Sequence, residues 1–227
     1  MSPEPAGPEV LPVNHHAAYV GCTGVTGVLA GLAMLFLGRS AARLVVGLAE
    51  LSTADRVVDV GCGPGNAVRL AARAGARVTG VDSSADMLRI ARAVTRNRVG
   101  SRDRAAVSWI HGSAEDLPIP DASATVLWTV ASVHHWSDVS AGLAQAYRVL
   151  RPGGRLLAIE RRVRPGASGL ASHGWTAQQA ESFAALCRDA GFIDVSTAER
   201  DFGRRSAAVV RAIRPWPDQA TGEGVSR

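Results

Sequence analysis

Three glycines at the end of an apolar run form the first group of residues in this sequence that could bind a ligand. The segment VVDVGCGPGN, at positions 57–66, begins with branched apolar residues typical of a buried strand. Its glycines are Gly61, Gly63 and Gly65. Glycine permits positive φ angles and lets the backbone touch a ligand, and a helix that begins near Asn66 would present its positive end. The pattern therefore predicts a ligand site at the end of this strand.

Asp82 indicates the class of ligand. It follows 21 residues after Gly61, at the end of the next predicted strand, where its carboxylate could bond two ribose hydroxyls. A ribonucleoside fits this arrangement. The pyrophosphate fingerprint G-x-G-x-x-G is not matched, because the third glycine comes one place early and Asn66 follows it, so a nicotinamide dinucleotide is less favoured. A phosphate loop of the G-x-x-x-x-G-K-[ST] type is excluded, because the sequence contains no Lys.

Histidines are the candidate general bases. His134 and His135, in VASVHHWSD, follow the fourth predicted strand on the same rim as the glycine loop. Histidine titrates near neutral pH and is the usual group that removes a hydroxyl proton. We predict that one of the two is the base. The alternative is that one of them only holds the loop in place.

Further histidines and aromatic residues are candidate contacts to the substrate whose hydroxyl proton is removed. They are His15, His16, Tyr19, Trp136, His173 and Trp175. The NHHA segment, at 14–17, precedes the Gly-rich stretch, and SHGWT is expected at the same end of the sheet as the glycine loop. The alternatives are an exposed histidine pair and ordinary packing. The cysteines, at 22, 62 and 187, have no metal-ligand spacing and leave one unpaired, so we expect no metal site and a reducing cytoplasm.

The elements that would position these residues alternate between short apolar runs and Ala- and Arg-rich helical stretches. Such alternation indicates a parallel sheet covered by helices on both faces. A helix over 176–191 is capped by Thr176 and Gly191. Only DFGRRS separates the last two runs, which permits an antiparallel hairpin and no crossover. We predict an α/β Rossmann-like, doubly wound seven-stranded sheet, mostly parallel, with an antiparallel last strand.

The domain organisation follows from the ends of this pattern. We expect a leader and helical lid over 1–50, the ligand-binding domain over 51–214 and a flexible tail over 215–227. Val20–Leu37 is uncharged and about as long as the ~20 residues of a membrane span. Its glycines, and the absence of a preceding basic residue, favour a Gly-rich entry and a short buried helix from about Gly27 to Leu37. Membrane contact is the alternative.

All 25 basic residues are Arg, and the net charge is +5. Arg89, Arg92 and Arg96 share one face of a predicted helix. We interpret this as a solvated face, with a nucleic-acid partner as the minority alternative. A monomer or homodimer is expected.

Five motifs in order resemble those of the class I S-adenosylmethionine-dependent methyltransferases, especially their small-molecule branch. VVDVGCGPGN is similar to their first motif and VTGVDSS to their acidic second motif. HGSAEDLPIPDASATVLW resembles the adenine-side segment, SVHHW the fourth-strand segment and LRPGGRLL the turn into the fifth strand. The resemblance covers about residues 55–195, nearly two-thirds of the chain.

The resemblance implies that the cofactor is S-adenosylmethionine. The matching positions imply these cofactor contacts: Asp59, Gly61, Gly63, Gly65, Asp82, Ser83, Met87, Ser113, Ala114, Glu115 and Thr129. Asp59 would orient the loop or the bound amino group, and Met87 would lie against the adenine. The alternatives are a loop N–H partner for Asp59 and a helix core position for Met87. The family often has Asp where this chain has Ser113, so a weaker or water-mediated adenine contact is expected.

The predicted function is methyl transfer, without a metal, to a hydroxyl of a small organic acceptor such as a sugar, lipid-like or polyketide-like molecule. Carbon and nitrogen acceptors are alternatives. A non-catalytic nucleoside-binding module and a membrane-associated enzyme are the other hypotheses.

Overall fold

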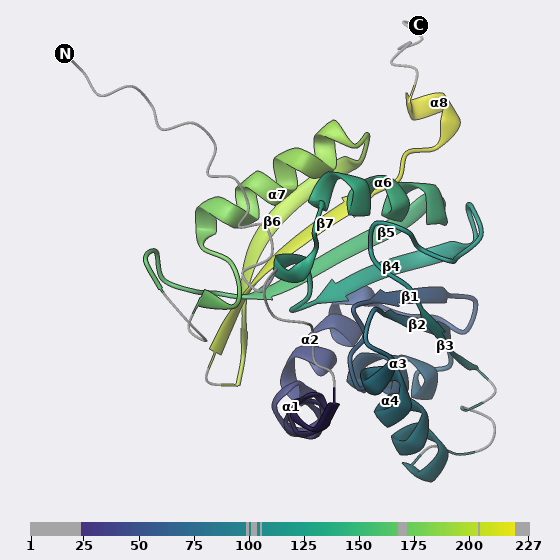
Figure 1. Ribbon diagram of the computed structural model, residues 1–227. Helices are drawn as coiled ribbons and strands as arrows, with labels where there is room; N and C mark the ends of the chain where they lie inside the picture. The colour runs from purple at the N-terminus through teal and green to yellow at the C-terminus, as the bar shows by residue number, and fades with distance from the viewer. Residues whose placement is uncertain are drawn as a thin grey trace, which may run out of the picture.

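Seven strands form one sheet in the computed structural model, which describes residues 24–98, 100, 104, 106–167, 172–203 and 205–220 (Figure 1). The strands are β1 (Arg56–Val60), β2 (Arg77–Asp82), β3 (Val107–His111), β4 (Ala124–Val130), β5 (Leu150–Arg161), β6 (Ile193–Phe202) and β7 (Arg205–Ile213). Their order is β3-β2-β1-β4-β5-β7-β6. The neighbours from β3 to β5 are parallel, and β7 is antiparallel to both β5 and β6. The predicted fold is confirmed, with the antiparallel last strand inserted between β5 and β6.

Helices cover both faces of the sheet, as predicted. Helices α6 (Val139–Val149) and α7 (Ala177–Asp189) pack on one face. The other face is covered by α2 (Arg39–Ala49), α3 (Asn66–Arg73) and α4 (Ala85–Arg98). Because side chains alternate along a strand, each strand contributes to two separate apolar clusters.

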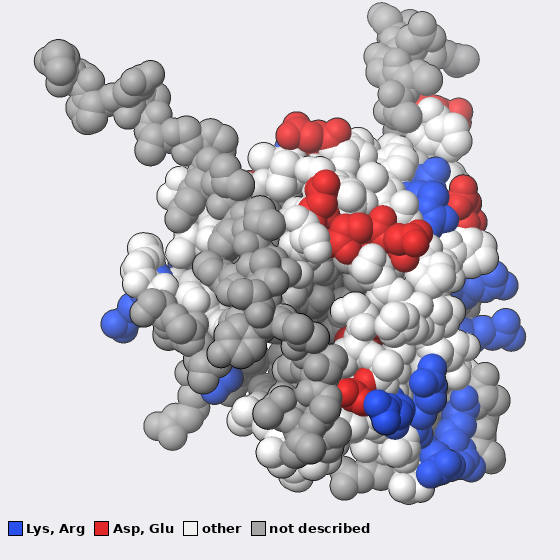
Figure 2. Space-filling model, in the orientation of Figure 1, with Lys and Arg blue, Asp and Glu red and all other residues white. Residues whose placement is uncertain are grey.

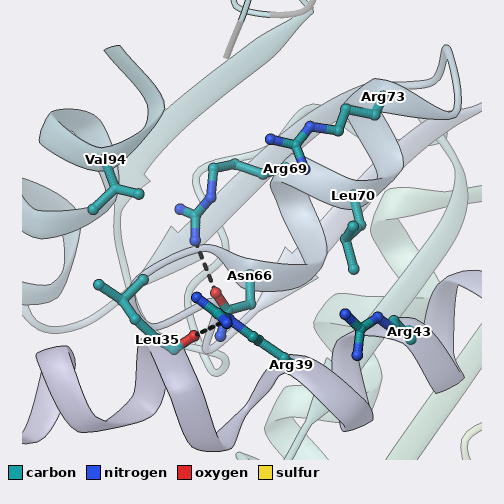
Figure 3. A pocket seen from close by; sticks show the side chains of 8 residues that line it. All are labelled: Leu35, Arg39, Arg43, Asn66, Arg69, Leu70, Arg73 and Val94. Carbon is teal, nitrogen blue, oxygen red and sulfur yellow. Dashed lines mark hydrogen bonds between the residues drawn. The ribbon is translucent and has the colours of Figure 1, made fainter. Parts of the chain in front are cut away.

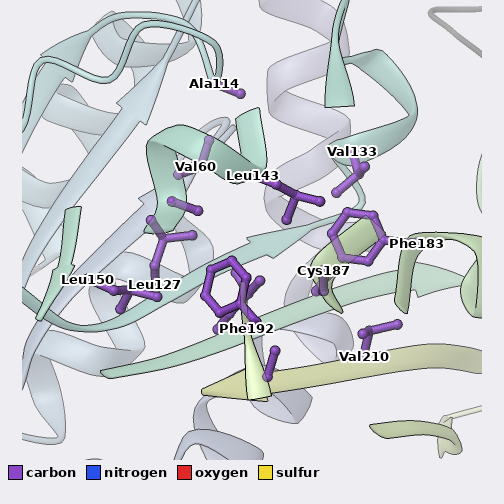
Figure 4. Close-up of a cluster of buried hydrophobic side chains, with 14 of the residues drawn as sticks. Val60, Ala114, Leu127, Val133, Leu143, Leu150, Phe183, Cys187, Phe192 and Val210 are labelled. Atoms are coloured by element: carbon purple, nitrogen blue, oxygen red, sulfur yellow. The ribbon is translucent and has the colours of Figure 1, made fainter. Parts of the chain in front are cut away.

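Strand β1 illustrates this division of the core. Val58 and Val60 belong to the cluster beneath α6 and α7 (Figure 4), whereas Val57 belongs to the cluster beneath α2 and α3. The small residues Ala67 and Ala71 on α3 are buried, which lets that helix approach the sheet closely.

The cap of α7 is also as predicted. The Thr176 hydroxyl accepts a hydrogen bond from the Gln179 backbone N–H at 3.2 Å, and the Gln179 side chain accepts one from the Thr176 N–H at 2.9 Å. This capping box satisfies two backbone donors that the first turn leaves open. Gly191, just after the helix, has φ 90°.

Helix α1 (Gly24–Leu37) differs from the buried helix that the sequence suggested. Leu29, Phe36 and Leu37 are 62%, 64% and 65% exposed. The helix contacts α4 along a narrow stripe, where a Cβ at Gly31 would lie 2.6 Å from Ile90 Cδ1. Among the described residues the contacts of this helix bury only part of its apolar surface, and most of its large side chains are exposed.

Residues on both sides of the expected domain 51–214 make packing contacts with it. Ala42 and Val45 of α2 are buried in the core cluster shared with α3. At the other end, a Cβ at Gly153 would lie 2.8 Å from the indole of Trp216, and the short helix α8 (Pro217–Ala220) follows. Residues 1–23 and 221–227 lie outside the described residues.

Within the described part of the chain, no single helix is long and apolar enough to cross a membrane. Gly31–Leu37 and Arg39–Ala49 pass that test only as a pair bent by 58°.

Candidate active site

The carboxyl ends of the central strands meet at one edge of the sheet. The glycine loop follows β1, Asp82 ends β2, and the 3-10 turn η1 (Val133–His135) follows β4. Glu160 lies one residue before the end of β5. In open α/β sheets this edge is where ligands bind, so the fold brings the predicted residues of three separate motifs to one place.

The glycine loop has a left-handed backbone. Its φ angles are 72° at Gly61, 53° at Gly63 and 80° at Gly65. A Cβ at Gly61 would lie 1.9 Å from Ser132 Oγ, and one at Gly65 would lie 2.1 Å from the Trp109 ring. A Cβ at Gly63 would meet no atom of the described residues within 4 Å. The loop is therefore packed at both ends and open in the middle.

The Asp82 carboxylate holds the loop from the neighbouring strand. Its Oδ2 atom accepts a hydrogen bond from the Gly63 N–H at 2.7 Å, and Oδ1 accepts one from the Ser84 N–H at 2.8 Å. Burial raises the pKa of Asp82, although these two hydrogen bonds oppose the shift. Each carboxylate oxygen has a second lone pair, so acceptor capacity for a ribose diol is left. Ser83 beside it is exposed.

Asp59 is the second buried carboxyl group at this edge. Burial raises its pKa to about 7, the Trp128 side chain opposes the shift, and the Asp82 charge adds to it. Asp59 and Trp128 are register partners on β1 and β4. Among the described residues no loop N–H donates to Asp59, which disfavours the alternative that it serves only as a partner inside the loop.

The residues of the expected adenine side divide into two groups. Met87 is buried against α1, where a Cβ at Gly31 would lie 3.1 Å from its sulfur, so its geometry fits the alternative of a packing residue. Ser113 Oγ accepts the Asp116 N–H at 3.2 Å. Ala114 is buried, and Glu115 Oε1 accepts the Ser137 N–H at 2.7 Å. Glu115 therefore ties this segment to the chain just after η1.

Thr129 on β4 offers a further polar atom at this edge. It is the register partner of Val60, the last residue before the glycine loop. Its hydroxyl is buried and has no hydrogen-bond partner among the described residues. A buried polar atom without a partner costs about 1–3 kcal/mol. The open Gly63 position and the remaining lone pairs of Asp82 together fit an adenosyl cofactor. The glycine loop and Asp82 are called the cradle below.

His134 is held by a buried glutamate. Its Nδ1 atom lies 2.9 Å from Glu160 Oε2, and Glu160 Oε1 accepts the Val133 N–H at 2.9 Å. The two side chains are 3% and 0% exposed. Burial lowers the pKa of His134, but the Glu160 charge and hydrogen bond outweigh it, so the pKa is raised overall. The His134 Nε2 atom is buried with no partner among the described residues.

Glu160 was missed by the sequence analysis. The signal was present, because RLLAIE ends an apolar strand in a charged residue, and a charge is buried only when it is paired. Its partner, His134, was not identifiable from a segment 26 residues away.

The three histidines near this edge lie together. The ring centroid of His134 is 4.0 Å from that of His135 and 5.3 Å from that of His173. The carbonyl of His173 accepts a hydrogen bond from Arg161 Nε at 3.0 Å, and the Trp175 N–H donates to the Arg161 carbonyl at 2.8 Å. The loop that contains His173 is thus fixed to the end of β5, beside η1.

The other predicted acceptor contacts are placed differently. Trp136 and Trp175 are both buried in the core cluster beneath α6 and α7, and Trp175 packs on Phe183 with ring centroids 4.8 Å apart. Their large apolar rings fill the core, which is the packing alternative and not an acceptor wall. The predicted lid residues lie outside the described residues: His15, His16 and Tyr19.

Arginines gather in two further places. A cavity of about 250 Å³ between α1, α2 and α3 is lined by Arg39, Arg43, Asn66, Arg69 and Arg73, together with Leu35, Leu70 and Val94 (Figure 3). The second group lies over α4, at the lower edge of the view in Figure 2. There Arg89 is ion-paired with Asp86, and Arg92 donates to the Trp109 carbonyl at 3.1 Å.

Comparison with known proteins identifies a domain in the part of the chain that carries these motifs. A family model described as "Methyltransferase domain" matches residues 58–158. The chain is 38% identical over 127 residues to 27-O-demethylrifamycin SV methyltransferase of Amycolatopsis mediterranei, covering 56% of this chain and 46% of that protein. It is 36% identical over 118 residues to a ubiquinone/menaquinone biosynthesis C-methyltransferase of Rubrivivax gelatinosus, covering 52% and 44%. The chain therefore spans less than half the length of these curated relatives.

Solved structures share the fold. An S-adenosylmethionine-dependent methyltransferase from Aquifex aeolicus aligns with a TM-score of 0.68 at 16% identity, covering 82% of this chain and 98% of that one. The [4+2]-cyclase SpnF aligns with a TM-score of 0.63 at 23% identity, covering 77% and 81%. The fold alone thus occurs with more than one reaction. Residues 58–158 therefore match a methyltransferase domain, and the sheet that carries them has the fold of S-adenosylmethionine-dependent methyltransferases of known structure.

Proposed function

We propose that the protein transfers a methyl group from S-adenosylmethionine to a hydroxyl of a small organic acceptor, with His134 as the general base. The observation that carries this proposal is the Glu160–His134 pair, which leaves one ring nitrogen directed away from the carboxylate and without a partner among the described residues. His134 lies on η1, and Ser132, the residue before this turn, packs against Gly61 of the glycine loop. Donor cradle and base are therefore neighbours.

The residues of the cradle would bind and orient the donor. Gly61, Gly63 and Gly65 would admit it to the backbone, Asp82 would hold the ribose diol, and Asp59 would face the amino group. When bound, S-adenosylmethionine supplies an electrophilic methyl group and leaves as a neutral thioether. Alignment of donor and acceptor can contribute ~7 to 11 kcal/mol to lowering the barrier, so binding in the correct orientation is the main task of this chain.

Glu160 would act as a positioning residue for the base. His134 Nε2 would accept the proton that the acceptor hydroxyl loses, and the bound S-adenosylmethionine would supply the methyl group. The Glu160 hydrogen bond keeps the proton on Nδ1, so Nε2 carries the lone pair that this step requires. The arrangement excludes solvent, because both side chains are almost fully buried.

A carbon acceptor is the second candidate. One of the related sequences is named a C-methyltransferase, and removal of a proton from carbon can use the same base. The small-molecule character of the acceptor and a cytoplasmic location belong to the proposal as well; Cys62 and Cys187 are both buried and unpaired.

The test uses S-adenosylmethionine with a ¹³C-labelled methyl group and a panel of hydroxylated aromatic, sugar and polyketide-like acceptors. The ¹³C shift of the product methyl distinguishes a methyl ether from a carbon-bound methyl. We expect a methyl ether, and Glu160→Gln should lower kcat while the cofactor Kd and the acceptor KM are retained. Turnover that yields only carbon-bound methyl would contradict the hydroxyl acceptor, and a Glu160→Gln effect confined to KM would contradict the positioning role.

A further inference from the structure

His134, His135 and His173 form a cluster that general-base catalysis does not explain, because a base requires only one imidazole. One ring nitrogen from each lies within 4.8 Å of those of the other two. The rings of His135 and His173 are 5.7 Å apart, centroid to centroid. The cluster combines two segments separated by almost 40 residues, and both are fixed by backbone hydrogen bonds to the edge of the sheet.

The Glu160 contact makes His134 suitable as a metal ligand. Histidines that bind metals almost always donate their other ring N–H to a carboxylate, a carbonyl or water, which fixes the tautomer and orients the ring. Here His134 Nδ1 lies 2.9 Å from Glu160 Oε2, and Nε2 is buried without a partner among the described residues. Glu160 thus contacts His134 in the way that a carboxylate contacts a metal-bound histidine.

The other two rings can complete the coordination sphere. Three nitrogens bound tetrahedrally to one ion at about 2.1 Å lie about 3.4 Å apart. The ring nitrogens lie within 4.8 Å of one another, so a small rotation of the more exposed rings would bring them to this separation. His135 is exposed and His173 is half-buried, whereas His134 is buried and held by Glu160.

We propose that His134, His135 and His173 bind one divalent transition-metal ion of the zinc class, oriented by Glu160. Three imidazoles with a fourth position open is a known coordination for Zn²⁺, and imidazole also suits Co²⁺ and Ni²⁺. The proposal rests on ring geometry and requires no acceptor. It has one consequence for the proposed function: a metal on His134 Nε2 occupies the lone pair that the base needs, so the zinc-loaded protein should turn over more slowly.

The experiment titrates Co²⁺ into the metal-free full chain, without cofactor or acceptor, and follows the visible absorption of the tetrahedral ion. Zn²⁺ competition and calorimetry give the affinity and stoichiometry. We expect one ion per chain. Glu160→Gln should weaken binding by about 10- to 100-fold, and His134→Ala and His173→Ala should each weaken it further.

Two control variants separate this site from adventitious binding. His111→Ala removes an exposed histidine on β3, and a variant with His15→Ala and His16→Ala removes the other adjacent pair. Both should retain the cobalt spectrum and its stoichiometry. If His134→Ala does not fold by circular dichroism, His173→Ala in the half-buried loop carries the test. No stoichiometric binding, or equal losses in a control variant, would overturn the proposal. Cofactor binding is measured separately, so failure here is distinguishable from failure of the proposed function.

Discussion

The cofactor cradle and the histidine cluster lie at the same edge of the sheet but are built in different ways. The cradle comes from two consecutive strands, and its geometry is set by the backbone: three left-handed glycines and a carboxylate bonded to two N–H groups. The cluster is made by side chains from η1, the end of β5 and the loop after it. A backbone-made site leaves a compact motif in the sequence, whereas a side-chain-made site depends on how distant segments meet.

The largest effect is expected from a substitution in the histidine cluster that leaves the cofactor cradle intact. His134→Ala should lower kcat by about 100- to 10,000-fold, because proton removal would lose its base. The cofactor Kd, measured by calorimetry, should be unchanged, since the cradle comes from other strands. His135→Ala should cost less, because His135 lacks the glutamate contact. Equal and mild losses in both variants would contradict the assignment of His134.

The next largest effect is expected from a substitution in the packed part of the cradle. Gly61→Ala should lower the free energy of unfolding by about 2 to 5 kcal/mol, because a left-handed φ and a contact 1.9 Å from Ser132 Oγ are both unfavourable. Gly63→Ala, where the space is open, should cost only about 1 to 2 kcal/mol from backbone strain. Urea denaturation measures both. If Gly63→Ala lowered the free energy of unfolding as much as Gly61→Ala, the conclusion that the cradle is open at Gly63 would be contradicted.

The third prediction concerns the ribose contact. Asp82→Ala should weaken S-adenosylmethionine binding by about 1 to 3 kcal/mol, the cost of losing charged hydrogen bonds. Asp201→Ala, an exposed carboxylate on β6, is the matched control and should leave the affinity unchanged. Near-normal binding by Asp82→Ala, measured by calorimetry, would refute the placement of the ribose.

The fourth prediction concerns the pH dependence of cofactor binding in the cradle. The pKa of Asp59 is about 7 in the free protein because of burial, and only the ionised form pairs with the cofactor ammonium. Binding should therefore strengthen as pH rises through 7 and be about tenfold weaker at pH 6 than at pH 8. Asp59→Asn should remove this dependence. An unchanged pH profile in that variant would assign the proton to another group.

The smallest effect is expected at the arginine face of α4. Arg89→Gln and Arg92→Gln should change the free energy of unfolding by no more than about 0.5 kcal/mol, as exposed substitutions usually do. Acceptor turnover should depend weakly on salt. A steep loss of turnover with rising salt, with a shallower salt dependence in either variant, would support the nucleic-acid alternative.

The sequence was sufficient for the features that depend on local pattern. Strand and helix alternation gave the sheet, the six-residue link gave the final hairpin, and the glycine spacing identified the cradle, because each follows from residues close in the chain. Thr176 was recognised as a helix cap for the same reason.

Features that depend on distant packing were not predictable in this way. The residues near Glu160 in the sequence do not indicate that His134 is its partner. The residues near Trp136 and Trp175 do not indicate whether these side chains line a pocket or pack in the core. Helix α1 was expected to be buried because it is apolar, but apolarity does not specify a partner large enough to cover it, and Phe36 is 64% exposed. Tertiary contacts decide these cases.

The most direct test of the account is calorimetric titration of the full chain with S-adenosylmethionine, with a nicotinamide dinucleotide as the parallel ligand. The cradle predicts saturable binding of one S-adenosylmethionine per chain and no measurable heat with the dinucleotide. No heat with S-adenosylmethionine and a clear signal with the dinucleotide would contradict the central claim, that the loop after β1 and Asp82 receive the adenosyl sulfonium.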